Sequence, residues 1–302
     1  MAEQVFLNGR IVDAAEARVS AFDAGLTHAA GLFETLRAYH GKVMRIGDHL
    51  ERLLRSAATL DLHIPVTAAE LQYAVHEVLD ANKLKDARLR LVVTPGNVPR
   101  AVLRQAQESG SREDDEVGEI EARPTVLATA AAVQMYPAEH YKNGWRVCIS
   151  PYKTNRLDPL AGHKTLAYLP RLMAMKDAAT RRCNEALWFT TENMLAEGSV
   201  CNVFVVKDGT ILTPPANTPI LPGTVRKAVM ELAGENGMPV EEKAIDINML
   251  LSAQEVFLTG SVLEIMPVTS IEKHVVGEGV PGEVTKRVMG LYQELIAKEC
   301  GV

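Results

Sequence analysis

The chain has 302 residues, of which 47% are hydrophobic and 5% aromatic. This length and composition are typical of an α/β protein with two domains. Its 32 Lys and Arg against 38 Asp and Glu give a net charge of −6. That charge argues against a general nucleic-acid or membrane-surface binder, because both need a basic face. It leaves room for one local basic pocket.

The cysteines predict neither a metal site nor a disulfide framework. Cys148, Cys183, Cys201 and Cys300 form no CxxC pair, so no metal ion is expected, and scattered thiols favour a reducing compartment. The N-terminus has no signal-peptide pattern, and the chain has no run of about 18 apolar residues that would span a membrane. We therefore expect a cytoplasmic protein without a membrane partner.

Turn signals and apolar patterns predict the elements of the first half. Two strands are expected at residues 5–7 and 11–12, on either side of an Asn-Gly turn. Two more strands are expected within residues 31–46, and one each at 88–93 and 125–133. Helices are expected to begin at Asp48 and at Thr67, because an acid follows three residues later in each case, as in a capping box.

Two segments suggest the domain organisation. Residues 105–123 carry seven acids and two bases, which is typical of a solvated loop. Residues 134–144 contain Pro and Asn-Gly and are the expected linker. We predict a smaller N-terminal α/β domain over 1–133 and a larger C-terminal domain over 145–302.

The second half alternates between predicted strands and helices. Strands are expected at 186–190, 203–207 and 256–259, and helices at 225–236 and 284–295. The Asp208-Gly209 pair predicts a hairpin turn.

Three segments of this half carry candidate chemistry. Residues 221–226 form a Pro-Gly turn that runs into a helix, where backbone amides favour an anion, and residues 259–262 end a strand in a Gly-Ser turn. Lys164 lies among apolar residues, and a desolvated lysine can form a Schiff base with an aldehyde. Tyr168 would follow one helical turn later. Taken alone, the Pro-Gly turn and Lys164 favour structural roles, an ordinary helix start and a surface lysine, and the Gly-Ser turn is a weak signal.

Taken in order, six segments match one family. They are residues 33–37 (FETLR), 49–53 (HLERL), Lys164, 197–204 (EGSVCNVF), 221–226 (LPGTVR) and 260–265 (GSVLEI). The series resembles the fold-type IV pyridoxal-phosphate enzymes, which include branched-chain aminotransferases, D-amino acid aminotransferases and aminodeoxychorismate lyases. The resemblance covers essentially the whole chain.

The resemblance implies a role for each matching residue. Lys164 would hold pyridoxal 5'-phosphate as an internal aldimine and move the substrate α-proton. Arg52 would bind the phosphate, and Glu197 would pair with the pyridine nitrogen so that the ring stays protonated. The other implied cofactor-binding residues are Tyr168, Leu221, Gly223, Thr224, Val225 and Ser261. The implied substrate-binding residues are Phe33, Arg37, Arg88, Arg90, Ser261 and Val262.

Some positions depart from the branched-chain pattern. Thr35 stands where those enzymes usually have Gly, and Arg88 where they usually have Tyr. Tyr168 is one residue closer to the lysine than in the family motif, and Val225 replaces a hydroxyl residue. The first and last motifs are at least as similar to aminodeoxychorismate lyases.

The resemblance implies an aminotransferase that moves an amino group between an amino acid, branched-chain-like and of L configuration, and a 2-oxo acid. The alternatives are an aminodeoxychorismate lyase, which eliminates pyruvate, a D-amino acid aminotransferase, and a protein that binds the cofactor, or another phosphate ligand, without turnover. The family fold implies an α+β N-terminal domain, a larger α/β-barrel-like C-terminal domain with the cofactor in the cleft, and a homodimer. Only small-molecule partners are expected, and no nucleic acid.

Overall fold

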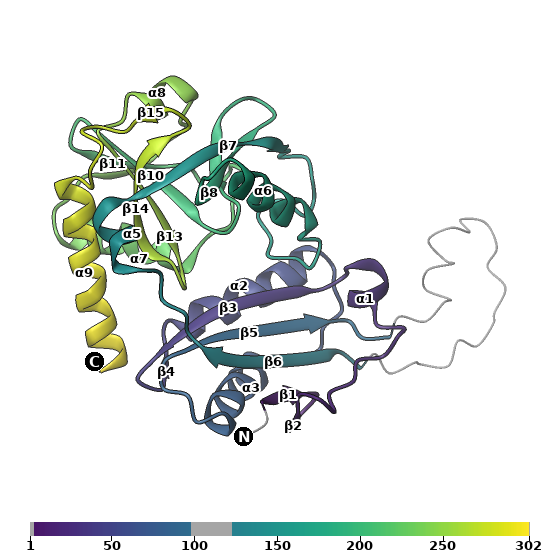
Figure 1. Cartoon of the computed structure of the whole chain (residues 1–302). Helices are drawn as coiled ribbons and strands as arrows, with labels where there is room; N and C mark the ends of the chain where they lie inside the picture. The colour runs from purple at the N-terminus through teal and green to yellow at the C-terminus, as the bar shows by residue number, and fades with distance from the viewer. Residues whose placement is uncertain (1–2, 98–122, 302) are drawn as a thin grey trace, which may run out of the picture. The chain divides into compact units, whose positions relative to one another are not determined.

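The computed structural model describes residues 3–97 and 123–301 and separates the chain into two compact units (Figure 1). Unit 1 comprises Met1–Thr35, Ile46–Ala132 and Lys164–Ala167, and unit 2 comprises Leu36–Arg45, Val133–His163 and Tyr168–Val302. The units thus place residues 36–45 with the second half and 164–167 with the first, whereas the predicted boundaries were 1–133 and 145–302. Those domain boundaries stay a prediction. Most of the predicted acidic loop, residues 105–122, lies outside the described residues.

A six-stranded sheet begins in unit 1. Its strands, in spatial order, are β2 (Arg10–Asp13), β1 (Gln4–Leu7), β6 (Thr125–Ala132), β5 (Ala87–Thr94), β3 (Leu32–Tyr39) and β4 (Lys42–Val43). β1 and β2 form the hairpin predicted at Asn8-Gly9, with Leu7 opposite Arg10. β5 alternates buried Leu89 and Leu91 with the more exposed Arg88 and Arg90, as expected for a strand with one polar face.

Two helices of unit 1 flank this sheet. α3 (Ala68–Ala81) packs on β1, β5 and β6, and α2 (Ile46–Thr59) packs on α3. The predicted capping box of α3 is confirmed: Thr67 and Glu70 exchange hydrogen bonds. The predicted start of α2 at Asp48 is wrong, because Arg45 adopts a left-handed conformation (φ 48°) and turns the chain into the helix at Ile46. The short helix α1 (Ala24–His28) precedes β3.

Unit 2 contains a curled nine-stranded sheet. Its path is β12 (Val240–Glu242), β11 (Thr210–Thr213), β10 (Asn202–Lys207), β13 (Glu255–Gly260), β14 (Glu264–Ile271), β7 (Trp145–Thr154), β8 (Glu185–Thr190) and β9 (Leu195–Gly198), and β15 (His274–Val275) pairs with β14. β9 ends this path yet also contacts β10. The sheet therefore curls back on itself.

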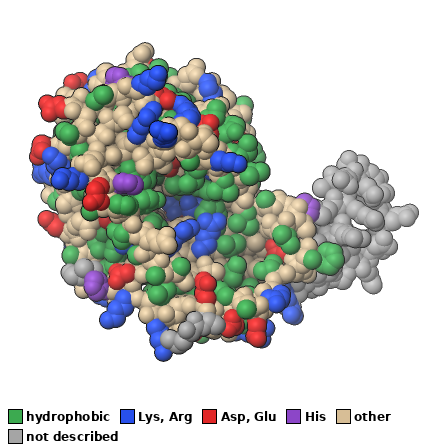
Figure 2. Space-filling view, viewed as in Figure 1, with side chains coloured by type: hydrophobic (Ala, Val, Ile, Leu, Met, Phe, Trp, Pro, Cys, Tyr) green, Lys and Arg blue, Asp and Glu red, His purple; other side chains and the backbone are tan. Residues whose placement is uncertain are grey.

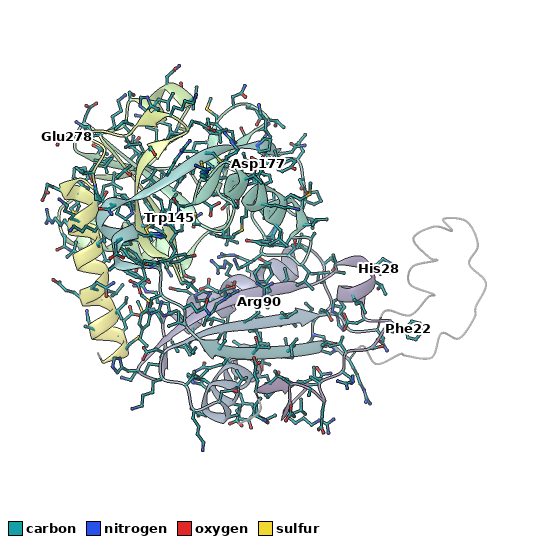
Figure 3. All side chains as sticks on the ribbon, viewed as in Figure 1. Phe22, His28, Arg90, Trp145, Asp177 and Glu278 are labelled. Carbon is teal, nitrogen blue, oxygen red and sulfur yellow. The ribbon has the colours of Figure 1, made fainter. Side chains whose placement is uncertain are left out.

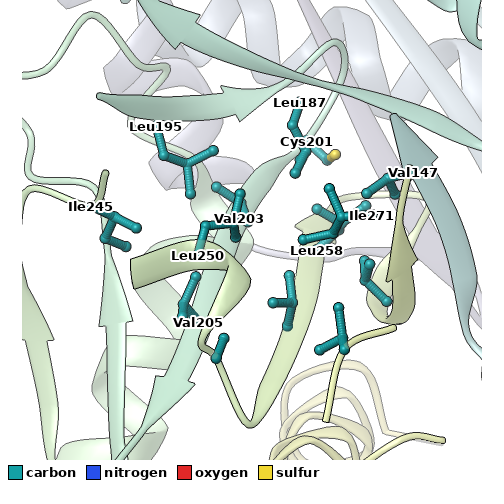
Figure 4. Close-up of a cluster of buried hydrophobic side chains, with 14 of the residues drawn as sticks. Val147, Leu187, Leu195, Cys201, Val203, Val205, Ile245, Leu250, Leu258 and Ile271 are labelled. Atoms are coloured by element: carbon teal, nitrogen blue, oxygen red, sulfur yellow. The ribbon is translucent and has the colours of Figure 1, made fainter. Parts of the chain in front are cut away.

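Alternation along the strands fills two cores. Val203 and Val205 of β10 join Leu258 of β13 in the cluster inside the curled sheet, which Figure 4 shows with Leu187, Leu195 and Ile271. Phe204 and Phe257 point to the opposite face and stack with ring centroids 4.9 Å apart. Successive residues of a strand face opposite sides, so one sheet serves both cores.

Helices cover the outer faces of this sheet. α7 (Thr224–Glu235) and α9 (Glu283–Cys300) pack on each other and on β13, and α6 (Leu169–Thr180) packs on β7 and β8. α8 (Ile247–Leu251) precedes β13, and α5 (Ala138–Asn143) lies within the segment predicted as a linker and packs on β14. No helix among the described residues is both long and apolar enough to span a membrane. Acidic and basic side chains are interspersed on the face of unit 2 seen in Figure 2.

Candidate active site

The backbone around Lys164 is paired with the start of β3 within unit 1. Phe33 N donates to Lys164 O and Leu166 N donates to Gly31 O, both at 2.9 Å, and Leu32 forms an antiparallel bridge with Thr165. Lys164 is therefore held in an extended segment. The sequence-based expectation that Lys164 and Tyr168 share one helical turn is wrong, because α6 starts only at Leu169.

Two cationic side chains lie at the ring of Phe33. The Arg90 guanidinium carbon lies 3.4 Å from the ring centroid and Lys164 Nζ lies 4.7 Å from it. Arg90 projects from β5 (Figure 3) and is half-buried, whereas Arg88, two residues earlier, is exposed. Of the predicted residues of unit 1, the structure thus gathers Phe33, Arg90 and Lys164.

Arg52 belongs to a buried polar cluster in the same unit. Its Nε donates to Glu34 Oε1 at 2.8 Å and its Nη2 to Glu34 Oε2 at 2.5 Å, while His49 Nδ1 lies 2.8 Å from Glu34 Oε2. His49 and Arg52 are three residues apart on α2 and so lie on one face of the helix. All three residues are at most 5% exposed.

The protonation states of this cluster follow from burial and charge. Burial alone would raise the pKa of Glu34, but the positive charge of Arg52 and the hydrogen bond from His49 lower that pKa to about 2. Burial lowers the pKa of His49, against the opposing effect of Glu34. At neutral pH the cluster therefore contains a carboxylate, a neutral imidazole that donates to it, and a guanidinium.

Glu197 is a buried carboxylate at the end of β9 in unit 2. Its Oε1 accepts from Arg171 Nη2 at 2.7 Å, and its Oε2 accepts from Leu221 N at 2.9 Å and from Asn202 Nδ2 at 3.4 Å. Asn202 Nδ2 also donates to Leu221 O at 2.8 Å. Two predicted residues, Glu197 and Leu221, are thus linked directly.

The segment that follows Glu197 is fixed by side chains from other elements. Tyr168 OH donates to Ser199 O at 3.1 Å, and Trp188 Nε1 donates to Ser199 Oγ at 3.1 Å. The carboxyl of Glu185, which is buried on β8, accepts from Ser199 N at 3.0 Å. Burial raises the pKa of Tyr168 to about 12, so its hydroxyl stays protonated.

The helix α7 begins at the predicted Pro-Gly turn. Gly223 is its N-cap, and Thr224 and Val225 are buried in the first turn. A Cβ on Gly223 would lie 2.0 Å from Asn202 Oδ1, so a larger residue at this position would have to displace the Asn202 side chain. Ser261 and Val262 form the predicted turn between β13 and β14 and are half-buried. Both turns belong to unit 2.

Arg37 also lies in unit 2, with its guanidinium buried against Glu264. Arg37 Nη1 lies 3.7 Å from Glu264 Oε1, Nη2 donates to Met135 Sδ at 3.0 Å, and the guanidinium stacks on Tyr39. Its Nε and Nη1 have no hydrogen-bond partner among the described residues. Arg37 therefore has a charge partner and spare donors.

These donor sets fit pyridoxal phosphate. In unit 1, the Arg52 guanidinium suits a phosphate and the Lys164 amine suits an aldehyde. In unit 2, the α7 N-terminus suits a phosphate and the Glu197 carboxylate suits a pyridine nitrogen. No group of three or more potential metal ligands occurs among the described residues.

Sequence reasoning assigned no role to four residues that the structure links to these sets. They are Glu34, His49, Arg171 and Asn202. The three-residue spacing of His49 and Arg52 is a usable signal, and Glu34, His49 and Asn202 all lie inside matched motifs. Arg171 lies 26 residues from Glu197 and gave no local signal.

Comparison with known proteins gives a consistent result. The model of a family described as amino-transferase class IV matches residues 31–271. A Methanocaldococcus jannaschii protein, provisionally named a branched-chain-amino-acid aminotransferase, is 33% identical over 295 residues, covering 98% of this chain and 97% of that protein. A D-alanine aminotransferase of Bacillus licheniformis is 32% identical over 98% of both chains.

Solved structures agree. A branched-chain amino acid aminotransferase of Escherichia coli has a TM-score of 0.87 at 28% identity, over 99% of this chain and 96% of that one. The branched-chain aminotransferase of Thermoproteus uzoniensis, solved with norvaline, has a TM-score of 0.84 at 30% identity with the same coverage. The branched-chain amino acid aminotransferase of Thermobaculum terrenum, solved in its PLP-form, has a TM-score of 0.82 at 25% identity over 99% and 95%. These likenesses confirm the predicted fold class.

Proposed function

The chain belongs to the class IV aminotransferases, and we propose that it uses pyridoxal phosphate to exchange an amino group between a branched-chain-like L-amino acid and a 2-oxo acid. The names of the M. jannaschii relative and of the solved structures support the branched-chain substrate. The observation that carries the proposal is Lys164, held in an extended segment by the backbone of β3, in the same unit as a buried Arg52.

Pyridoxal phosphate would supply an aldehyde that condenses with amines and a protonated ring that accepts an electron pair. Lys164 would hold the cofactor and move the proton at the substrate Cα with its Nζ. The Phe33 ring contacts both Lys164 and Arg90 and would limit the positions of their cationic groups.

Phosphate binding is assigned to Arg52, aided by Gly223, Thr224, Val225 and Ser261. Arg52 is oriented by Glu34, and the first turn of α7 offers backbone N–H groups at the positive end of a helix.

The ring would be held by Glu197, Leu221 and Tyr168. Glu197 would accept from the ring nitrogen and Leu221 would pack on the ring face. Tyr168, protonated and fixed on Ser199 O, would act as a hydrogen-bonding group and not as a base.

Substrate binding is assigned to Phe33, Arg37, Arg88, Arg90, Ser261 and Val262. Arg90 is the first choice for the carboxylate, because its guanidinium is half-buried and stacked at the ring that Lys164 also contacts. Arg37 is the second, because it keeps unused donors while Glu264 balances its charge.

D-amino acids are the second candidate substrates. Relatives named D-alanine aminotransferases match almost as well, at 32% identity for the B. licheniformis enzyme. A panel of L and D donors, each tested with 2-oxoglutarate and pyruvate as acceptors, distinguishes the two. Preferential turnover of D donors would replace the branched-chain proposal.

Lys164 provides the sharpest test. The protein purified with pyridoxal phosphate should absorb visible light, and Lys164→Ala should abolish that absorbance. Lys153→Ala is the matched control, because Lys153 bonds to Asn193 at an exposed position of unit 2. An unchanged spectrum in Lys164→Ala would exclude the mechanism. Pyruvate release from aminodeoxychorismate without an acceptor would favour the lyase.

A cytoplasmic homodimer is part of the proposal. The four free, buried cysteines support a reducing compartment. Exposed apolar side chains on α6, namely Leu169, Leu172 and Met173, support self-association. Light scattering should give twice the chain mass of 32.9 kDa, and a monomer at micromolar concentration would rule the dimer out.

A further inference from the structure

Glu197 is in contact with a cation that no family motif supplied. Arg171 of α6 donates from Nη2 to Glu197 Oε1 at 2.7 Å, while Leu221 N donates to the other oxygen at 2.9 Å. The Glu197 side chain is 8% exposed and that of Arg171 is 19% exposed. Both carboxylate oxygens are therefore engaged, and one of them by a charged donor.

The Arg171 guanidinium is itself held in place. Its second nitrogen, Nη1, donates to Gly198 O at 3.0 Å, so the two nitrogens bind the carboxylate and the adjoining peptide together. Its carbon lies 4.4 Å from the centroid of Trp188, and Trp188 donates to Ser199 Oγ. The planar guanidinium fork and its stacking surface are both used, which a lysine could not reproduce.

This arrangement has an electrostatic consequence. A carboxylate removed from water favours its neutral form unless a cation or hydrogen bonds stabilise the charge. Arg171 supplies both, and it also fixes the side-chain torsions of Glu197 through a second attachment at Gly198. A carboxylate that is kept anionic and immobile is the acceptor that a protonated ring nitrogen needs.

We infer that Arg171 is a positioning residue for the aminotransferase reaction, which acts through Glu197 by keeping that carboxylate anionic and correctly oriented toward the ring nitrogen of the cofactor. The inference rests on the proposed function, in which Glu197 pairs with that nitrogen. Arg171 itself does not contact the reacting atoms in this role.

A double-mutant cycle tests whether Arg171 acts through Glu197. Arg171→Met should lower kcat by about tenfold or more, the effect of one hydrogen bond to a charged group. In a Glu197→Ala background the same change should lower kcat less than about twofold, because coupled residues are not additive. Arg171→Lys should recover part of the activity, since it keeps the charge but loses the fork.

Arg181→Met is the matched control. Arg181 caps the C-terminal end of α6 and pairs with Asp177 and Glu272, and neither of these acids belongs to the proposed site. The substitution should leave kcat within about twofold, as surface ion pairs usually contribute little. Thermal melting of each variant separates loss of folding from loss of function.

A spectroscopic measurement supplements the kinetics. In protein loaded with ¹⁵N-labelled pyridoxal phosphate, NMR gives the ¹⁵N chemical shift of the ring nitrogen. This chemical shift should be that of a protonated pyridine in the wild type and in Arg181→Met. In Arg171→Met it should move toward the value of a neutral pyridine. Equal chemical shifts in the wild type, Arg181→Met and Arg171→Met would overturn the inference. Additive effects of Arg171→Met and Glu197→Ala on kcat would also overturn it. Either result would leave the proposed function intact. A wild type that does not take up the cofactor would overturn both.

Discussion

Arg52 donates from Nε and Nη2 to the two oxygens of Glu34, at 2.8 and 2.5 Å. This paired contact between α2 and β3 fixes the plane of the guanidinium before any anion binds. Since Glu34 is fully buried and His49 donates to the same carboxylate, the orientation of Arg52 depends on a closed set of three side chains. The residue that fixes the proposed phosphate ligand is thus an acid.

Glu34→Gln is the corresponding test. The neutral amide has only one acceptor oxygen, so it can neither accept both guanidinium hydrogen bonds nor balance the charge of Arg52. Arg52 should therefore lose its fixed orientation, and the affinity for pyridoxal phosphate should fall. Removing one partner of a buried ion pair costs about 3–5 kcal/mol of stability. Equilibrium dialysis measures the first effect and urea denaturation the second. Glu283→Gln, at an 89% exposed side chain, should change neither; unchanged cofactor affinity in Glu34→Gln would separate Glu34 from phosphate binding.

The same cluster predicts how stability depends on pH. Glu34 protonates near pH 4.5 in the unfolded chain but only near 2 in the folded one, so its contribution is complete above about pH 4.5 and is lost as the pH falls toward 2. The pKa of His49 lies below 6.5 in the folded state, so the unfolded chain binds that proton first and stability also declines below pH 6.5.

Urea midpoints measured from pH 7 to pH 3 check this prediction. The wild type should lose stability progressively on acidification, and Glu34→Gln should show a shallower decline below pH 4.5. If the urea midpoints of the wild type and of Glu34→Gln fall in parallel with pH, protonation of Glu34 is not what lowers the stability of the folded state.

Local features were predictable from the sequence, and features made by distant segments were not. The predicted capping box of Thr67 and Glu70 lies within one helical turn, and the structure confirms it. The helical spacing assumed for Lys164 and Tyr168 failed, because residues 164–166 pair with β3, more than 130 residues earlier in the chain. Backbone pairing over that distance overrides a local helical preference.

The candidate site follows the same rule. Family motifs pointed to Arg52, Lys164 and Glu197, because each lies in a matched segment. The groups that orient them, such as Glu34 and Arg171, come from other elements, and their contacts exist only after folding. An ion pair between separate elements leaves no periodicity in the sequence.

Arg90 and Arg88 provide a comparison of two candidate carboxylate ligands on one strand. Arg90 is half-buried and stacked on Phe33, whereas Arg88 is exposed. A charged contact to the substrate carboxylate is stronger when it is shielded from water than when it is exposed. Arg90→Met should therefore raise the KM for the 2-oxo acid by about tenfold or more, and Arg88→Met should raise it by much less. Steady-state kinetics with both variants gives the answer. A larger effect from Arg88→Met would move the carboxylate site to the exposed residue.

Two glycines of the α7 region give opposite predictions for the same substitution. A Cβ on Gly223 would lie 2.0 Å from Asn202 Oδ1, so Gly223→Ala must displace the side chain that donates to Leu221 O. We expect weaker cofactor binding and a loss of about 1–3 kcal/mol of stability, the usual cost of overpacking.

Gly234, which is exposed near the C-terminal end of α7, has open space where a Cβ would lie, with no neighbouring atom of the described residues within 4 Å. Gly234→Ala should therefore stabilise the helix by about 0.5–1 kcal/mol. Urea denaturation and cofactor dialysis of the two variants measure the contrast. Equal behaviour of both substitutions would show that the contact between Gly223 and Asn202 does not constrain the α7 N-terminus.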